Sequence, residues 1–230
     1  MELRLTLRRG ESVLLTFLIP VLILVFFSLV DVLPTGTADP VDFLLPGVLA
    51  LSVMSTAMTG LAIATGFERS TGVLKRLAVT PLGRRDLIAA KLVVVLLVEA
   101  LQTVVLLAVG ISLGWSPTAG VVGALVGMAL ATVGFAGVGM LMAGALPALT
   151  TLALANAVYL VLLFLGGIVV PIDDMPAALR VVARALPTGA LSDITHGTLT
   201  GTTVPGVAWL VLALWAVAGP ALAAWRFRWE

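Results

Sequence analysis

Cysteine is absent from this 230-residue chain, and histidine and tyrosine occur once each, as His196 and Tyr159. The chain therefore has no disulfide, no thiol nucleophile and no thiolate metal ligand, and one histidine excludes a multi-histidine metal site. Its only lysines, Lys75 and Lys91, lack the neighbours of a phosphate-binding loop. The chain is therefore not predicted to bind or hydrolyse ATP in the P-loop manner, and we expect it to bind no cofactor or metal.

Features of membrane-embedded hydrolases are also missing. A rhomboid-type protease needs a serine nucleophile and a histidine at membrane depth, whereas His196 lies in the polar segment THGTLTG. The zinc-protease pattern H-E-x-x-H is absent as well. The sequence therefore favours a protein without catalytic activity of its own.

Charged residues are scarce, at 11% of the chain, while hydrophobic residues make up 60%. Soluble domains carry about a quarter charged and about half apolar residues, so this composition predicts an integral membrane protein. We expect one transmembrane domain, residues 1–230, with an all-α fold. Six apolar windows approach the roughly 20 residues that cross a bilayer: 13–33, 46–65, 87–113, 120–145, 150–170 and 205–225.

The connections between these windows differ in charge. Three basic residues precede the first window, six lie in the segment Phe67–Lys91 and two follow the last window, against only Arg180 and Arg184 in the last long loop. Lys and Arg favour the cytoplasmic side of a membrane. Both termini and the basic segment are therefore predicted to be cytoplasmic, in the cell inner or plasma membrane.

The loop 66–90 contains a short amphipathic pattern. Over Gly72–Leu77, Val73, Leu74 and Leu77 lie on one side of a helix, and Lys75 and Arg76 on the other. Pro81 then ends the pattern. This stretch predicts a short helix on the cytoplasmic surface, shaped to contact a soluble partner.

The loop 171–204 is too long for a simple turn. Asp174 as a capping acid, followed by Pro176 in the first turn, predicts a helix start. Leu179 begins an apolar stripe, and Pro187 is expected to stop the helix. We expect one or two short helices folded against the outer mouth of the bundle.

Polar residues inside the windows are candidates for a substrate path. Glu99 lies near the middle of the third window with Gln102 on the same face, and the fifth window contains Asn156 and Tyr159. A carboxylate at that depth must face the bundle interior, a partner or water. Glu99 is either a contact for substrate or protons, or half of a structural hydrogen bond, with Asn156 or Tyr159 as suggested partners. In the fourth window, small residues recur at Gly123, Gly127 and Ala131, which favours close helix packing.

The basic segment resembles the signature region of ABC-2 type transporter permeases, the membrane halves of ATP-driven exporters. The matching residues are Glu68, Gly72, Leu74, Lys75, Arg76, Leu77, Thr80, Pro81, Leu87 and Lys91, and a second match in the outer loop involves Gly167, Pro171, Pro176, Leu179 and Pro187. The chain departs from the family pattern at Leu186, where asparagine is usual, and near His196, where an arginine is usual.

The resemblance implies a coupling helix that docks on a cytoplasmic ATPase subunit, which would use ATP and Mg²⁺. The residues implied in coupling are Glu68, Arg69, Gly72, Leu74, Lys75, Arg76, Leu77 and Pro81, and those implied at an extracellular gate are Pro171, Pro176, Leu179 and Pro187. The expected function is the permease subunit of an exporter of amphiphilic, drug-like or lipid-like molecules, similar to the daunorubicin-resistance type. It is expected to work as a dimer with itself or a related permease, in the lipid bilayer and without nucleic acid. The alternatives are a stand-alone secondary carrier or channel that uses Glu99, or a polysaccharide or glycolipid exporter subunit.

Overall fold

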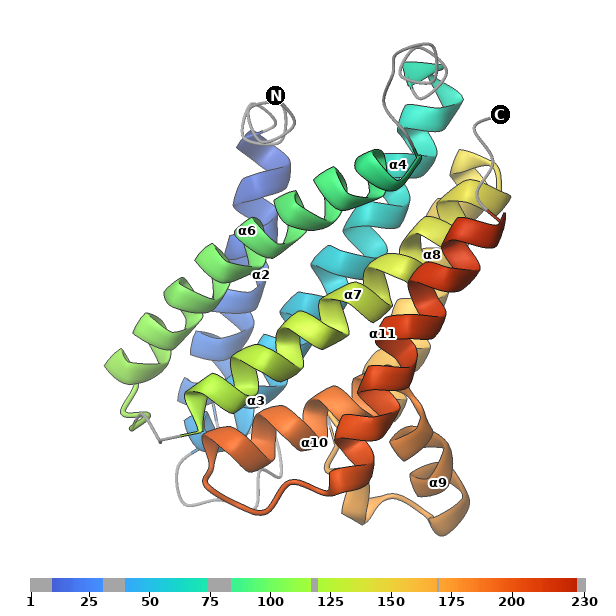
Figure 1. Ribbon diagram of the computed structural model, residues 1–230. Coiled ribbons are helices and arrows are strands. Elements are labelled where there is room, and N and C mark those ends of the chain that lie inside the picture. Colours follow the sequence, from blue (N-terminus) through green and yellow to red (C-terminus); the bar gives the residue numbers. More distant parts are fainter. Residues whose placement is uncertain (1–9, 31–39, 74–83, 117–119, 169, 227–230) are drawn as a thin grey trace.

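The computed structural model describes residues 10–30, 40–73, 84–116, 120–168 and 170–226, and every regular element within them is a helix (Figure 1). The elements are α2 (Gly10–Leu29), α3 (Pro40–Val53), the π-helix η1 (Met54–Gly60), α4 (Leu61–Ser70), α6 (Arg84–Ser112), α7 (Val121–Ala145), α8 (Ala148–Leu165), the 3₁₀ turn η2 (Ile172–Asp174), α9 (Ala177–Ala185), α10 (Pro187–Leu199) and α11 (Gly206–Arg226). The predicted all-α membrane bundle is confirmed.

Five helices in the described ranges are long and apolar enough to cross a membrane: Pro40–Ser70, Asp86–Ser112, Val121–Ala145, Ala148–Leu165 and Gly206–Arg226. They correspond to the second through sixth apolar windows. The first window corresponds to α2, whose apolar part, Thr16–Leu29, is shorter than these. The count of six spans therefore stays a prediction.

The second span is longer than its apolar window predicts. It starts at Pro40 and runs through α3, η1 and α4 to Ser70, with Asp42 in its first turn. Proline is tolerated in a first helical turn, and an acidic residue there is favoured by the helix dipole. Since α4 ends at Ser70 and α6 begins at Arg84, the loop predicted at 66–90 includes the end of α4 and the first turns of α6.

Successive long helices run in opposite directions through the bundle (Figure 1). The end at which α4 stops and α6 begins, here called the basic end, is also where α2 begins and α11 ends. The short helices α9 and α10 lie at the opposite, distal end. The predicted short helices in the loop 171–204 are therefore confirmed, and they cover one end of the bundle.

Helix α7 packs closely against α10 and α11 because glycine removes the side chain at the contacts. A Cβ built on Gly120 would lie 1.9 Å from the Thr198 carbonyl oxygen of α10, and one on Gly137 would lie 2.2 Å from the Gly219 carbonyl carbon of α11. The predicted packing role of the small residues is also confirmed at Gly127, where an added Cβ would lie 2.6 Å from Ile194 Cγ2 of α10.

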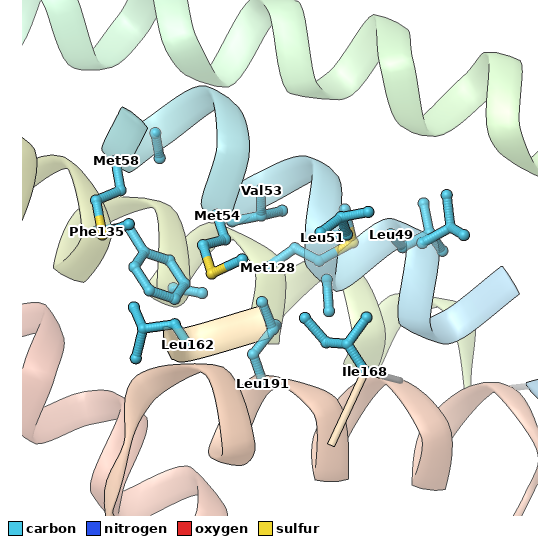
Figure 2. Packing of buried hydrophobic residues seen from close by; sticks show 14 of the residues in the cluster. Leu49, Leu51, Val53, Met54, Met58, Met128, Phe135, Leu162, Ile168 and Leu191 are labelled. Carbon is cyan, nitrogen blue, oxygen red and sulfur yellow. The ribbon is translucent and has the colours of Figure 1, made fainter. Parts of the chain in front are cut away.

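The apolar core gathers around α3 and η1. Figure 2 shows their side chains meeting those of α7, α8 and α10, with these residues labelled: Leu49, Leu51, Val53, Met54 and Met58, then Met128, Phe135, Leu162, Ile168 and Leu191. Met54, Met58, Phe135 and Leu191 are fully buried. The second span is thus the central element against which the other helices pack.

Candidate functional site

An ion pair joins the two helices that flank the connection at the basic end. Lys91 Nζ of α6 lies 2.5 Å from Glu68 Oε2 of α4. The Lys91 side chain is only 4% exposed and that of Glu68 is 28% exposed. A buried ammonium without its carboxylate carries a large desolvation penalty, so this pair holds the ends of α4 and α6 together.

A second cation at the basic end fixes α4 to α7. Arg69 Nη1 donates a hydrogen bond of 2.9 Å to the Ala143 carbonyl. Ala143 is in the last turn of α7, where carbonyls lack helical partners and the dipole favours a cation. Glu68 and Arg69 therefore tie α4 to two different helices.

The chain leaves α4 through a glycine turn. Gly72 has a φ of +73°, a left-handed conformation that favours glycine. The Thr71 hydroxyl donates to the Phe67 carbonyl and so caps the end of the helix. The remaining predicted coupling residues, Leu74, Lys75, Arg76, Leu77 and Pro81, lie outside the described residues.

A cavity of about 270 Å³ lies between α2, the second span and α8. It is lined by Thr16, Ile19, Pro20, Leu51, Ser55, Thr59, Asn156 and Tyr159. Asn156 and Tyr159 were predicted to line a substrate path, and the structure places both on this cavity. Its polar groups are hydroxyls and one amide, and among the described residues its lining contains no carboxylate or basic group.

The π-helix η1 contributes two of the cavity's hydroxyls, Ser55 and Thr59. π-turns are uncommon and often occur at functional positions. In the described part of the chain, the Thr59 hydroxyl is buried and has no hydrogen-bond partner. A buried hydroxyl without a partner is costly, and this one belongs to a residue that lines the cavity.

Glu99 is separated from this cavity. Its Oε2 accepts a hydrogen bond from the Thr132 hydroxyl of α7, and the residue is 5% exposed. The suggested pairing with Asn156 or Tyr159 is wrong: Asn156 instead donates to the Leu152 carbonyl of its own helix. Glu99 joins α6 to α7, as the structural alternative predicted, although with a different partner.

Gln102 is also used between helices. Its Nε2 donates to the Thr16 carbonyl of α2 at 2.8 Å, and its Oε1 accepts from the Thr56 hydroxyl of η1 at 3.4 Å. Gln102 therefore connects α6 to two elements that border the cavity, without lining it itself. The four residues predicted to line the path therefore do not form one site. Glu99 contacts α7, Gln102 contacts α2 and η1, and Asn156 and Tyr159 line the cavity.

At the distal end, the predicted gate residues mark the boundaries of the short helices. Pro171 precedes η2, Pro176 is the N-cap residue of α9, and Leu179 of α9 is 44% exposed. The expected capping role of Asp174 is wrong, because Asp174 lies in η2 and α9 has no side-chain cap. Pro187 follows the end of α9 and also begins α10 as its first residue, since proline is accommodated at that position.

Several features of this site were not predicted from the sequence. The run of hydroxyls in MSTAMTG, Met54–Gly60, was the available signal for the cavity wall. The pairing of Glu68 with Lys91 had no local signal because the residues lie in different helices. In addition, Gly110–Gly114 reads G-x-S-x-G, but the exposed Ser112 hydroxyl only donates to the Val109 carbonyl of its own helix, so it does not form a catalytic pair with His196.

The described helices thus form a multi-pass bundle with a tied pair of helices at one end and a partly open cavity between α2, the second span and α8. Residues 1–194 match the family described as ABC-2 type transporter, which covers most of the chain. The chain belongs to the ABC-2 type transporter family and is a permease subunit of an ABC transporter. A search of curated proteins finds no match to it.

Proposed function

We propose that this chain is the membrane subunit of an exporter that moves an amphiphilic, drug-like or lipid-like molecule outward. ATP and Mg²⁺ are used by a separate cytoplasmic subunit, and this chain carries no catalytic residue or cofactor. Both termini and the basic end face the cytoplasm, in the cell inner or plasma membrane. The subtype that we propose is the daunorubicin-resistance type.

The observation that carries the substrate class is the chemistry of the cavity. Its apolar wall includes Ile19, Pro20 and Leu51, and its polar wall includes Ser55 and Asn156. Such a mixture suits a largely apolar molecule with a few hydrogen-bonding groups. Sugar-binding paths use aromatic stacking, and Tyr159 is the one aromatic side chain among the described residues that line this cavity. The lining therefore favours an amphiphile over a polysaccharide.

The position of Glu99 disfavours the alternative of a stand-alone carrier. An ion site needs a carboxylate that a water-filled path can reach. Here Thr132 holds one carboxylate oxygen, and the residue lies away from the cavity. Coupling to an ATPase subunit is the better explanation for movement of substrate.

The ties at the basic end support a lever mechanism. The segment between Ser70 and Arg84 would receive the motion of the ATPase subunit. The Glu68–Lys91 ion pair would pass this motion to α4 and α6 together, and Arg69 would pass it to α7. A rigid-body displacement of these helices then changes access to the cavity.

We further propose that two permease chains, identical or related, form the complete path. The lipid-facing sides of α6 and α8 are apolar, with Val104 64% exposed and Phe164 62% exposed. Such surfaces accept either lipid or a second permease. Two ATPase subunits would then act on the two basic ends.

The test is reconstitution of the chain in proteoliposomes with the ABC ATPase subunit that co-purifies with it. The probes are daunorubicin, followed by its own fluorescence, and a fluorescent phospholipid analogue. Movement of a probe is expected only with ATP and both subunits present. Leu74→Asp is expected to abolish probe-stimulated ATP hydrolysis while the chain still inserts. Probe movement by the chain alone, or unchanged coupling in Leu74→Asp, would contradict the proposal.

A further inference from the structure

His196, the single histidine, connects α10 to the start of the second span. Its Nε2 lies 3.0 Å from the Phe43 carbonyl oxygen of α3, and its ring centroid lies 4.9 Å from that of Phe43. Its Nδ1 lies 2.9 Å from the Ser192 carbonyl oxygen of the same helix, so each ring nitrogen contacts one backbone carbonyl. Burial lowers the pKa of His196 below its ordinary value, and the contacts with the Ser192 and Phe43 carbonyls oppose this shift in part.

Ser192, one helical turn earlier, connects the same face of α10 to α8. The Ser192 hydroxyl donates to the Gly167 carbonyl at 3.0 Å, in the turn that follows α8. It also lies 3.2 Å from His196 Nδ1. Gly167 adopts a φ of +72°, which directs the chain away from α8 at this point. The two side chains thus hold three segments together: α10, α3 and the turn after α8.

These contacts lie directly beyond the cavity at its distal side. Along α3, Phe43 precedes the cavity residue Leu51 by about two turns, and along α8, Gly167 follows the cavity residue Tyr159 by about two turns. Two turns correspond to roughly 11 Å of helix. The two helices that border the cavity are therefore joined to α10 at the same level.

The other face of α10 is fixed. Its Thr198 and Ile194 lie against Gly120 and Gly127 of α7, too close for any added Cβ. Core and backbone contacts of this kind are not easily separated. The face with His196 and Ser192 combines hydrogen bonds, each with a modest net contribution, with the buried side chain of Leu191 and a close contact between Gly166 and Thr188. The hydrogen bonds of His196 and Ser192 are the contacts on this face that a single side-chain substitution removes.

We propose that His196 and Ser192 form a latch that closes the distal end of the substrate path by holding α3 and the turn after α8 against α10. The latch opens when α3 and α8 move apart, and α10 stays with α7. This inference rests on the proposed function, because it takes the cavity as part of the path. His196 and Ser192 act as positioning residues and need not touch the substrate.

The absence of cysteine allows a direct test with one introduced thiol. Ser55→Cys places the thiol on the cavity wall of the full chain, assembled with its ATPase subunit in right-side-out membrane vesicles without nucleotide. A membrane-impermeant maleimide added outside reports access from the distal end. In the parent the thiol is expected to react slowly, and adding His196→Ala is expected to raise the rate about fivefold, the effect of one lost hydrogen bond.

Two further variants distinguish loss of the hydrogen bond from His196 to the Phe43 carbonyl from a general loss of packing around α10. His196→Gln keeps an N–H for the Phe43 carbonyl and is expected to label at the parent rate. Thr195→Ala is the matched control, because the Thr195 hydroxyl bonds only to Leu191 and Ser192 carbonyls within α10, and it should also label at the parent rate. Ser192→Ala should raise the rate, and it replaces His196→Ala if that variant does not insert.

Labelling at the parent rate in both His196→Ala and Ser192→Ala would overturn the latch, as would fast labelling in His196→Gln. Thiols at exposed positions check the orientation separately. Thr202→Cys at the distal end should react from outside, and Thr71→Cys at the basic end should not. The reverse pattern would overturn the proposed function itself, whatever the result for His196.

Discussion

The two ends of the bundle are held by different kinds of contact. At the basic end, the buried ion pair Glu68–Lys91 and the bond from Arg69 to α7 join helices through charge. At the distal end, α10 is held by backbone packing against Gly120 and by the neutral hydrogen bonds of His196 and Ser192. In the proposed mechanism, the ties at the first end make helices move together, and the hydrogen bonds at the second end release one face of α10. This difference suits a lever at one end and a gate at the other.

The largest effect is expected from Glu68→Gln, which leaves the Lys91 ammonium buried without its carboxylate. Removing one partner of a buried pair costs about 3 kcal/mol, and the thermal midpoint in detergent should fall clearly. The charge exchange Glu68→Lys with Lys91→Glu should recover part of the loss. A Glu68→Gln variant as stable as the parent would show that the pair does not hold the two helices.

The distal end offers the matched control for that variant. Arg184 and Asp173 also form an ion pair, at 2.7 Å, but their side chains are 48% and 78% exposed. An exposed pair contributes about 0.5 kcal/mol, so Arg184→Gln should leave the thermal midpoint nearly unchanged. Equal losses in Arg184→Gln and Glu68→Gln would remove the contrast between the two ends.

Gly120→Ala tests the packed face of α10. The added Cβ would meet the Thr198 carbonyl, which is backbone and cannot turn aside. Overpacking of this kind costs about 1 to 3 kcal/mol, measurable as a lower thermal midpoint. Gly206→Ala in α11 is the control, because nothing lies within 4 Å of a Cβ there. A stable Gly120→Ala variant would mean that α10 is not fixed to α7.

Hydropathy predicted the long helices well because the length and apolarity of a span do not depend on which helix it contacts. The connection at the basic end was predicted for a similar reason, because charged side chains are excluded from lipid whichever way the helices pack. The cavity was not predicted, since Thr16, Ser55 and Asn156 come from three separate elements. The partner predicted for Glu99 was wrong, because the sequence around Glu99 does not show which residue of another helix, here Thr132, lies opposite it. Pro187 was expected only to stop a helix, and local sequence does not show that the next helix starts at once.

A smaller and more selective effect separates the cavity from Glu99. Asn156→Leu removes an amide from the cavity wall and should raise the KM for probe transport severalfold with little change in stability, as expected for one lost hydrogen bond. Glu99→Gln keeps an acceptor for the Thr132 hydroxyl and should leave probe transport close to that of the parent. Loss of transport in Glu99→Gln with normal transport in Asn156→Leu would favour the carrier alternative.

The most direct test of the lever uses a single thiol at the basic end. Val73 is 39% exposed and lies at the edge of the segment proposed to receive the ATPase subunit. In the otherwise cysteine-free chain, Val73→Cys should resist an impermeant maleimide outside intact cells and should crosslink to a thiol on the ATPase subunit through a short bismaleimide, at a rate that changes with ATP. Labelling of Val73→Cys from outside the cell, or no crosslink in an actively transporting complex, would contradict the account.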